Sequence, residues 1–330
     1  MRKPLFPLFT DPIIKKQEVG SRLTADAKAE LIPLKERSPS PPWYQLSVIR
    51  MNSTYLECVD VMSGMKGMGS TMAQPLMLMI AYLGTWGPFR ILTDSYPYGT
   101  FAEFIETLLL ALFIFVGMSF CFWLGMKLMI SRECFRYTHV PIRFNRKNRK
   151  VYIFRWDGTV LEEDWDKLSF VAATGGLGEF KIAGFVFEED GETIKDTFAL
   201  PYISDSDERF LFSQFEFVRR FMEEPDELPH LAGQVENVMD IYDRRESWYM
   251  GFHRLWVGFG AGMNGLLAII TLPLALLFSL GRWTAMRTCT IPRWPAEVEA
   301  ACAVEPNDPY LRDRNHLAAP GTVKKPEFMR

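Results

Sequence analysis

The sequence has few of the residues from which metal and redox centres are built. It contains four histidines in 330 residues, and none has the spacing of a pair of metal ligands. Its five cysteines show neither CxxC spacing nor the density of a secreted disulfide scaffold. These residues are His139, His230, His253, His316, Cys58, Cys121, Cys134, Cys289 and Cys302. We therefore expect no metal centre and no cofactor.

Catalytic motifs are also scarce. Ser63 and Lys66 fit the SxxK pattern of some hydrolases, but the SDN and KTG elements that accompany it are absent. Residues 260–265 match GxGxxG without the preceding strand that a phosphate-binding turn requires. The acidic run at residues 162–166 lacks the spacing of a calcium loop. We therefore expect that the protein is not an enzyme. The alternative of a membrane-bound hydrolase is supported only by the SxxK match.

No charge of one sign dominates the chain. The net charge is −3, which gives no electrostatic support to nucleic-acid binding. The N-terminus does not have the pattern of a cleavable signal, because Pro7 breaks its apolar run and Asp11 ends it. Basic residues instead concentrate between Arg132 and Lys150.

That basic segment directly follows the longest apolar run, Thr107 to Ile130, whose only charge is Lys127. A helix of this length spans a hydrocarbon core of about 30 Å, and the Lys and Arg beyond its end mark the cytoplasmic side. A weaker apolar stretch at 71–92 precedes it, and the linker between the two has no Lys or Arg. We predict a transmembrane hairpin over residues 68–130.

A third apolar block covers residues 251–282. Basic residues flank its apolar run, Leu255 to Leu280, with Arg254 on one side and Arg282 and Arg287 on the other. Its length fits a single span, whereas the positive flanks favour a short hairpin broken near 262–265 and a cytoplasmic C-terminus. The glycines expected to form a close helix-packing face are Gly258, Gly262 and Gly265.

Residues 131–250 have the pattern of β-strands joined by tight turns. Asp157-Gly158 and Asp190-Gly191 are type I′ hairpin signals between β-rich runs. Apolar residues then recur at helical spacing, at Leu211, Phe215, Val218 and Met222. This order predicts a pleckstrin-homology-like barrel ending in an amphipathic helix, with a simpler α+β domain as the alternative. The fold class is thus an α+β membrane protein with three or four transmembrane helices and a cytoplasmic β-rich domain.

The two ends of the chain lack a core pattern of their own. Residues 1–45 are polar and proline-bearing, which indicates an extended tail. Residues 46–67 mix apolar and polar positions and predict a helix at the membrane interface, so that 1–67 forms an N-terminal cytoplasmic segment. Residues 283–330 predict a polar, proline-rich C-terminal tail.

Basic residues in the first hairpin of the 131–250 domain define a candidate contact surface. They are Arg143, Arg146, Lys147, Arg149 and Lys150. Each such charge beside an anionic leaflet is worth about 1 kcal/mol. Two interpretations fit them: they determine topology, or they contact anionic lipid or a partner protein.

Three stretches, PIRFNRKNRKVYIFRWDGTVLEEDW, FEFVRRFMEEPDELP and IPRWPAEVEAACAVEPNDPY, are informative together. Their combination resembles a family of uncharacterised proteobacterial inner-membrane proteins that are often encoded near type VI secretion clusters and their toxic effectors. The resemblance covers most of the chain from residue 45 to residue 312. Its anchors are Arg143, Asn145, Arg146, Trp156, Asp157, Gly158, Trp165, residues 219–224, Trp294-Pro295 and Asp308-Pro309-Tyr310.

The resemblance implies a multi-pass protein of the bacterial inner membrane that acts as an immunity or accessory protein. Such a protein would bind a cognate toxin or effector and occlude its active or membrane-inserting face, with no chemistry of its own. The alternative is a membrane-anchored, lipid-contacting adaptor or sensor of a secretion complex. Membrane lipids are expected contacts in both cases, and the sequence leaves self-association open.

Overall fold

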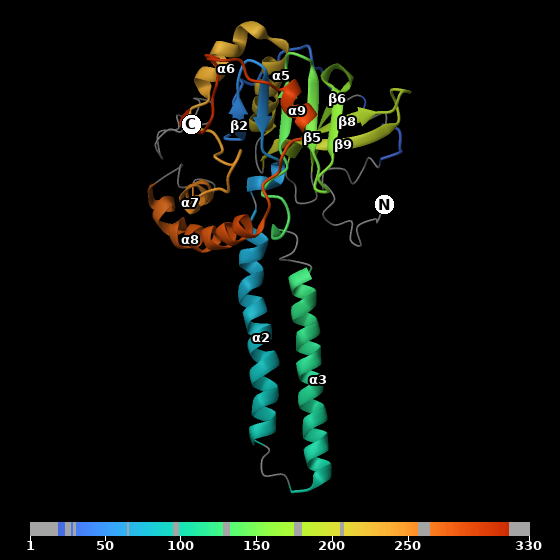
Figure 1. The fold of residues 1–330 in the computed structure, drawn as a ribbon, viewed down its shortest axis with the longest axis vertical. Helices are drawn as coiled ribbons and strands as arrows, with labels where there is room; N and C mark the ends of the chain where they lie inside the picture. Colours follow the sequence, from blue (N-terminus) through green and yellow to red (C-terminus); the bar gives the residue numbers. More distant parts are fainter. Residues whose placement is uncertain are drawn as a thin grey trace. The chain divides into compact units, whose positions relative to one another are not determined.

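The computed structural model describes residues 19–23, 28, 31–64, 66–94, 99–127, 133–174, 180–204, 208–256 and 265–316 (Figure 1). The chain divides into two compact units. The β-unit comprises residues 1–63, 139–244 and 291–330, and the helical unit comprises 64–138 and 245–290. The N-terminal and C-terminal segments, expected to be separate from the β-rich domain, therefore belong to it.

The larger sheet of the β-unit has five antiparallel strands in the order β2-β3-β4-β5-β6. They are β2 (Val48–Met51), β3 (Tyr55–Cys58), β4 (Ile142–Asn145), β5 (Lys150–Phe154) and β6 (Val160–Asp164). The turn between β5 and β6 has Gly158 at φ +87°, as the Asp-Gly signal predicts. The predicted interfacial helix at 46–67 is wrong, because β2 and β3 pair as a hairpin there and extend the sheet.

The second sheet has four antiparallel strands in the order β1-β7-β8-β9. They are β1 (Leu31–Ile32), β7 (Ser169–Thr174), β8 (Phe180–Phe187) and β9 (Ile194–Ser204). Asp190 holds the turn between β8 and β9 by accepting hydrogen bonds from the Glu192 and Thr193 amides. Gly191 follows at φ +67°, so this second predicted hairpin is confirmed.

Helix α5 (Glu208–Glu223) follows the strands and packs against β4, β8 and β9. Its predicted apolar face is confirmed, because the four residues at helical spacing are all buried: Leu211, Phe215, Val218 and Met222. They join Trp165 and Phe170 in one core cluster. Short helices η5 (Trp165–Lys167), η6 (Pro225–Glu227) and α6 (Leu228–Gln234) complete this region. The α+β class is confirmed.

Within the predicted polar tail, residues 291–316 fold onto the five-stranded sheet, whereas residues 283–288 are helical and belong to the helical unit. Residues 291–316 contain α9 (Ala296–Ala301) and η8 (Arg314–His316). Val298 and Cys302 pack against Tyr55 and Tyr152 of the sheet. The backbones of Met51 and Arg312 exchange two hydrogen bonds of 3.0 and 2.7 Å, so the C-terminal segment pairs with β2.

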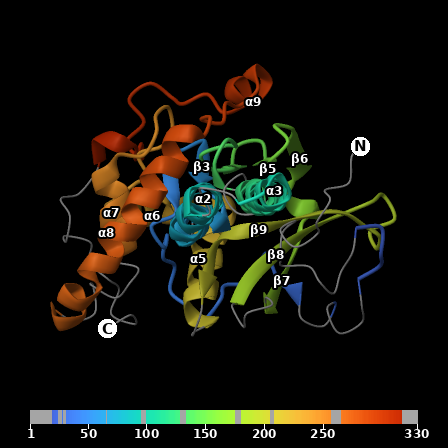
Figure 2. The ribbon, with the colours of Figure 1, turned by 90° about the horizontal axis from the view of Figure 1, so that it is seen from below.

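The helical unit contains the two predicted hairpin helices, α2 (Met68–Asp94) and α3 (Phe101–Gly125), lying side by side (Figures 1 and 2). A Cβ at Gly84 would lie 2.8 Å from Met118 Cβ, which shows how closely the helices approach. Thr100 caps α3 by accepting the Glu103 amide. Among the residues that the structure describes, three helical stretches are long and apolar enough to cross a membrane: Met68–Asp94, Phe101–Gly125 and Ala268–Thr288.

The third apolar block forms two helices, α7 (Trp248–Trp256) and α8 (Gly265–Thr288). Trp248 Nε1 donates to Ser279 Oγ at 3.1 Å, and Trp256 Nε1 donates to the Ala268 carbonyl at 2.8 Å. These contacts show that α7 runs antiparallel to α8. Of the predicted packing glycines, Gly258 and Gly262 lie outside the described residues, and Gly265 begins α8. The short helix η3 (Val61–Gly64) precedes the helical unit.

Gly184 in β8 provides a stability test of the second sheet. A Cβ there would overlap the Phe198 ring on β9, so we expect Gly184→Ala to lower the free energy of unfolding by about 1–3 kcal/mol. Gly233→Ala in α6 is the control, because nothing lies near its Cβ position and alanine favours a helix. Chemical unfolding of the detergent-solubilised protein measures both, and equal stability of the two variants would contradict the expected overlap.

Candidate functional site

The predicted basic surface lies on the hairpin between β4 and β5. Asn145 shapes the turn, because its side-chain oxygen accepts hydrogen bonds from the Lys147 and Asn148 amides. Arg149 then takes a positive φ of +55° before β5 begins. This geometry sends the side chains of the basic residues in different directions, and the structure does not bring them together as one surface.

Arg143 is an interior residue, which corrects its predicted place on the basic surface. Its side chain is 0% exposed, and that of its partner Glu57 is 2% exposed. The guanidinium donates to Glu57 Oε2 from Nε at 3.2 Å and from Nη2 at 2.9 Å. It also contacts Glu299 of α9 at 3.3 Å. Because strand residues alternate between faces, one basic residue of the run points inward.

Aromatic rings and the C-terminal segment enclose this ion pair. The guanidinium carbon of Arg143 lies 4.4 Å from the Tyr55 ring centroid and 4.8 Å from that of Trp294. Trp294 Nε1 donates to Glu57 Oε1 at 2.9 Å, so both carboxylate oxygens are hydrogen-bonded. Burial lowers the pKa of Arg143, but the electrostatic effects of Glu57, Tyr55 and Glu299 together more than offset it, and the net shift is upward.

Neighbouring anchors of the family resemblance join the same region. Asn145 Nδ2 donates to the Ala301 carbonyl at 2.7 Å, just beyond α9. Asp308 Oδ2 accepts from the Ser53 amide at 2.7 Å and from its hydroxyl at 2.6 Å. Residues that are distant in sequence thus attach the C-terminal segment to the sheet.

The remaining four basic residues are engaged locally. Arg149 pairs with Asp166 and, at 2.7 Å, with Glu223, which also accepts the Trp165 indole N–H at 2.6 Å. Lys150 pairs with Glu162, and Lys147 pairs with Glu305. The half-buried Arg146 lies over the Phe221 ring. Acidic neighbours therefore reduce the charge that this hairpin would present to an anionic leaflet.

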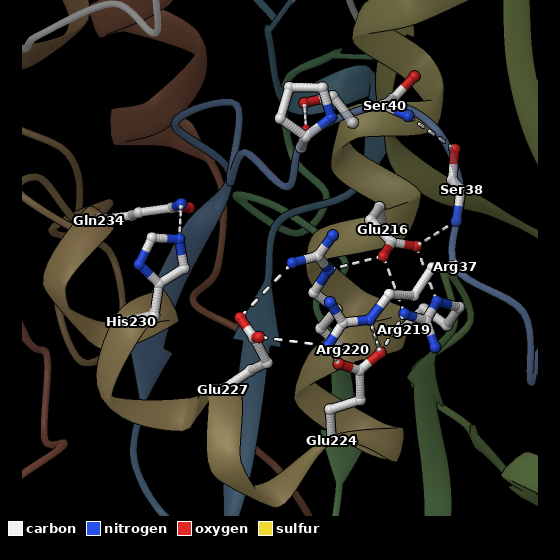
Figure 3. Close-up of polar contacts among 12 residues, drawn as sticks. Arg37, Ser38, Ser40, Glu216, Arg219, Arg220, Glu224, Glu227, His230 and Gln234 are labelled. Carbon is white, nitrogen blue, oxygen red and sulfur yellow. Dashed lines mark hydrogen bonds and ion pairs between the residues drawn. The ribbon is translucent and has the colours of Figure 1, made fainter.

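A second charged cluster lies at the C-terminal end of α5 (Figure 3). Buried Glu216 accepts from Arg219 at 2.7 Å, from Arg220 at 2.6 Å and from the Ser38 amide at 3.1 Å. Arg37, in the N-terminal segment, pairs with two more carboxylates of the cluster. These are Glu224, which Arg219 also contacts, and Glu227, which Arg220 also contacts.

The cluster favours the ionised forms of Glu216 and Glu224. Burial raises the pKa of Glu216, but hydrogen bonds from Arg219, Arg220 and Ser38 outweigh it, so the net pKa lies below the ordinary value. Glu224 behaves in the same way with Arg37 and Arg219. A carboxylate with a lowered pKa and guanidinium partners is suited to holding chain segments together and is a poor proton donor near neutral pH.

The other motifs have structural partners. The Lys66 ammonium donates to the Tyr137 carbonyl, so it is engaged in a backbone contact. Residues of the acidic run pair with lysines or arginines of the β-unit. Among the described residues, no group of three or more His, Cys, Asp and Glu side chains is placed to hold a metal ion.

Sequence reasoning missed the acidic partners Glu57 and Glu216. Glu57 lies 86 residues from Arg143 and comes from a segment that was expected to be helical. One signal was present: the anchors of the resemblance include Arg143, Asn145, Trp294 and Asp308, and the structure brings these into contact with one sheet.

Removing one member of the buried pair should be costly. We expect Arg143→Met to lower the free energy of unfolding by about 3–5 kcal/mol, because it leaves the Glu57 carboxylate buried and uncompensated. Lys150→Met removes a basic residue of the same hairpin at an exposed pair, and we expect little change. Tryptophan fluorescence during chemical unfolding measures both, and equal destabilisation would argue against an interior role that is specific to Arg143.

The charged cluster of α5 should make the free energy of unfolding fall at acidic pH. The pKa of Glu216 is lowered from 4.5 in the folded state, so its contribution is present above that value and is lost as pH falls through the folded pKa. Unfolding midpoints between about pH 3 and 7 should show this loss, and Glu216→Gln should make the acid limb shallower. Identical acid limbs in both proteins would refute the assignment.

A family model described as a family of unknown function (DUF6708) matches residues 118–306, more than half of the chain. No curated protein and no solved structure matches. The matched region begins in α3 and ends beyond α9, so it includes Arg143, Arg219 and Glu299. The chain belongs to the DUF6708 family.

Proposed function

We propose that the protein is anchored in a membrane by α2 and α3 and acts by binding a partner protein. The observation that carries the anchoring is the surface of these helices. Apolar side chains cover it, with Leu78 71% exposed and Phe113 76% exposed. The helices have 27 and 25 residues, and about 20 residues suffice to cross a hydrocarbon core. A lipid bilayer would remove this apolar area from water.

The charge pattern supports an orientation for this hairpin. Basic residues gather after α3, whereas the linker between α2 and α3 has no Lys or Arg. By the positive-inside rule, the β-unit faces the cytoplasm of a bacterial cell whose inner membrane holds the hairpin. The short linker is then the part that faces the periplasm.

The β-unit is suited to recognition by a preformed surface. Polar contacts of buried charged residues join its N-terminal, central and C-terminal segments. Glu216 accepts the Ser38 amide, and Arg143 pairs with Glu57 and Glu299. A rigid surface loses little conformational entropy on binding. Together with the resemblance to proteins encoded beside secreted effectors, this supports an immunity role: the protein binds a cognate toxin and occludes its active or membrane-inserting face.

The lipid-contacting adaptor is the weaker proposal. It relied on the basic residues from Arg143 to Lys150, of which Arg143 is buried and three others have acidic partners. An adaptor therefore has less charge for an anionic leaflet than the sequence indicated.

Co-expression tests the immunity proposal. The toxin-like gene nearest to this one is expressed in a heterologous bacterium, with and without the full-length protein. We expect survival only with the protein, and co-purification of the two proteins from detergent. Lys150→Met is expected to protect fully, because its exposed pair does not hold the fold. Arg143→Met should protect less, in proportion to its loss of folded protein.

A variant with an unrelated two-span hairpin in place of residues 68–125 locates the binding surface. Full protection assigns binding to the β-unit, and lost protection assigns it to α2 and α3. Death of cells that carry the full-length protein in their membrane would overturn immunity. Loss of secretion without self-intoxication, on deletion of the gene, would favour the adaptor.

A further inference from the structure

The α7–α8 pair is closed at its base by a buried ion pair. Arg282 Nε donates to Glu246 Oε2 at 2.7 Å, and the two side chains are 1% and 4% exposed. Glu246 lies two residues before α7, and Arg282 lies in the C-terminal third of α8. The α7–α8 segment thus enters and leaves at one contact, between Glu246 and Arg282, as a helical hairpin does.

This base is packed against the beginning of α2. Arg282 Nη1 donates to the Lys66 carbonyl at 3.1 Å. A Cβ at Gly281 would overlap the Thr71 side chain, and Gly67, at φ +91°, lies against the Arg282 backbone. Both views show α8 lying across the end of α2 at which the α2–α3 hairpin begins (Figures 1 and 2).

The connectivity of the β-unit limits how often the block can cross a membrane. Strand β3 pairs with β4, and Met51 pairs with Arg312, so the segments before residue 64, from 139 to 244 and after residue 290 form one body. Such a body lies on one side of a bilayer. The chain leaves it at residue 63 and returns at 139 after two crossings, by α2 and α3.

The chain leaves again at residue 244 and returns at 291, so residues 245–290 must cross an even number of times. Helix α8 could cross once by its length, but the return path along it is α7, which has nine residues. At 1.5 Å per residue α7 is about 13 Å long, too short to span about 30 Å. A single crossing by α8 would separate strands that are hydrogen-bonded.

The exposed apolar surface of α8 nevertheless has to be removed from water by lipid or protein. Its exposed side chains recur at helical spacing along one stripe: Leu266, Ile269, Ile270, Leu277 and Leu280. The opposite stripe is buried, with Ala275, Phe278 and Arg282 facing the interior of the helical unit. At its C-terminal end, Arg287 lies 5.5 Å from the centroid of the half-exposed Trp283 ring, a pairing that suits a headgroup region.

We infer that the α7–α8 pair is a same-side hairpin that lies in the cytoplasmic lipid leaflet, with the exposed stripe of α8 in the acyl region. The inference rests on the proposed membrane anchoring by α2 and α3. The protein then has two transmembrane helices and one monotopic hairpin, and its C-terminal segment lies on the same side as the rest of the β-unit.

Cysteine labelling tests this arrangement in the full-length protein. Leu266→Cys reports the start of the exposed stripe, Asp94→Cys the far end of α2, and Lys167→Cys the β-unit surface. A membrane-impermeant maleimide is applied to sealed right-side-out vesicles, to inverted vesicles, and to both after detergent. Labelling of the unsubstituted protein gives the background from Cys121, which is exposed on α3.

We expect Asp94→Cys to label from the periplasmic side and Lys167→Cys from the cytoplasmic side. Leu266→Cys should label at least about tenfold more slowly than either until detergent is added. Labelling of Leu266→Cys from the periplasmic side would show that α8 crosses and would overturn the hairpin. Labelling from the cytoplasmic side as fast as Lys167→Cys would show that lipid does not cover the stripe. Labelling of Asp94→Cys and Lys167→Cys from the same side of the membrane would instead refute the anchoring by α2 and α3.

Discussion

The buried pair of Arg143 and Glu57 is the interaction on which the β-unit depends. Moving two charges out of water costs several kcal/mol per ion, and the pair is stable only when further contacts offset that cost. Here the guanidinium binds one carboxylate oxygen twice, Trp294 donates to the other, and aromatic rings cover the cation. Because β3, β4 and the C-terminal segment each supply one part, the fold requires all three together.

Helix α5 follows the same rule on its polar face. An amphipathic helix usually leaves that face in water, yet Glu216 and Arg219 are as buried as the apolar residues of the helix. They can be buried because each has several partners. Glu216 accepts from the Ser38 amide of the N-terminal segment as well as from Arg219, and Arg219 also pairs with Glu224. The segment before β2 is therefore held by charge as well as by Trp43 and Tyr44, which are buried in the core cluster.

Local patterns were enough to predict α2, α3, α5 and the hairpins around Gly158 and Gly191, because hydropathy, helical spacing and turn residues lie within short windows. They could not predict β2 and β3, four-residue strands that are defined by pairing of β2 with β3 and of β3 with β4. They also placed Arg143 on the surface, since its partner Glu299 lies 156 residues away. Burial of a charge is a property of its partners, and these come together only in the tertiary fold.

The pair of Arg282 and Glu246 extends the same principle to the helical unit. An unpaired arginine at the centre of a membrane helix costs about 2.5–3.5 kcal/mol on insertion scales. Pairing Arg282 at the point where α8 rests on α2 removes it from any lipid-facing position. The apolar stripe from Leu266 to Leu280 ends just before this pair, so the ion pair sets the limit of the surface that lipid can cover. By hydropathy alone, α8 is one long apolar helix that could span a membrane. The buried charge of Arg282 instead favours an α7–α8 hairpin that returns to the side from which it started.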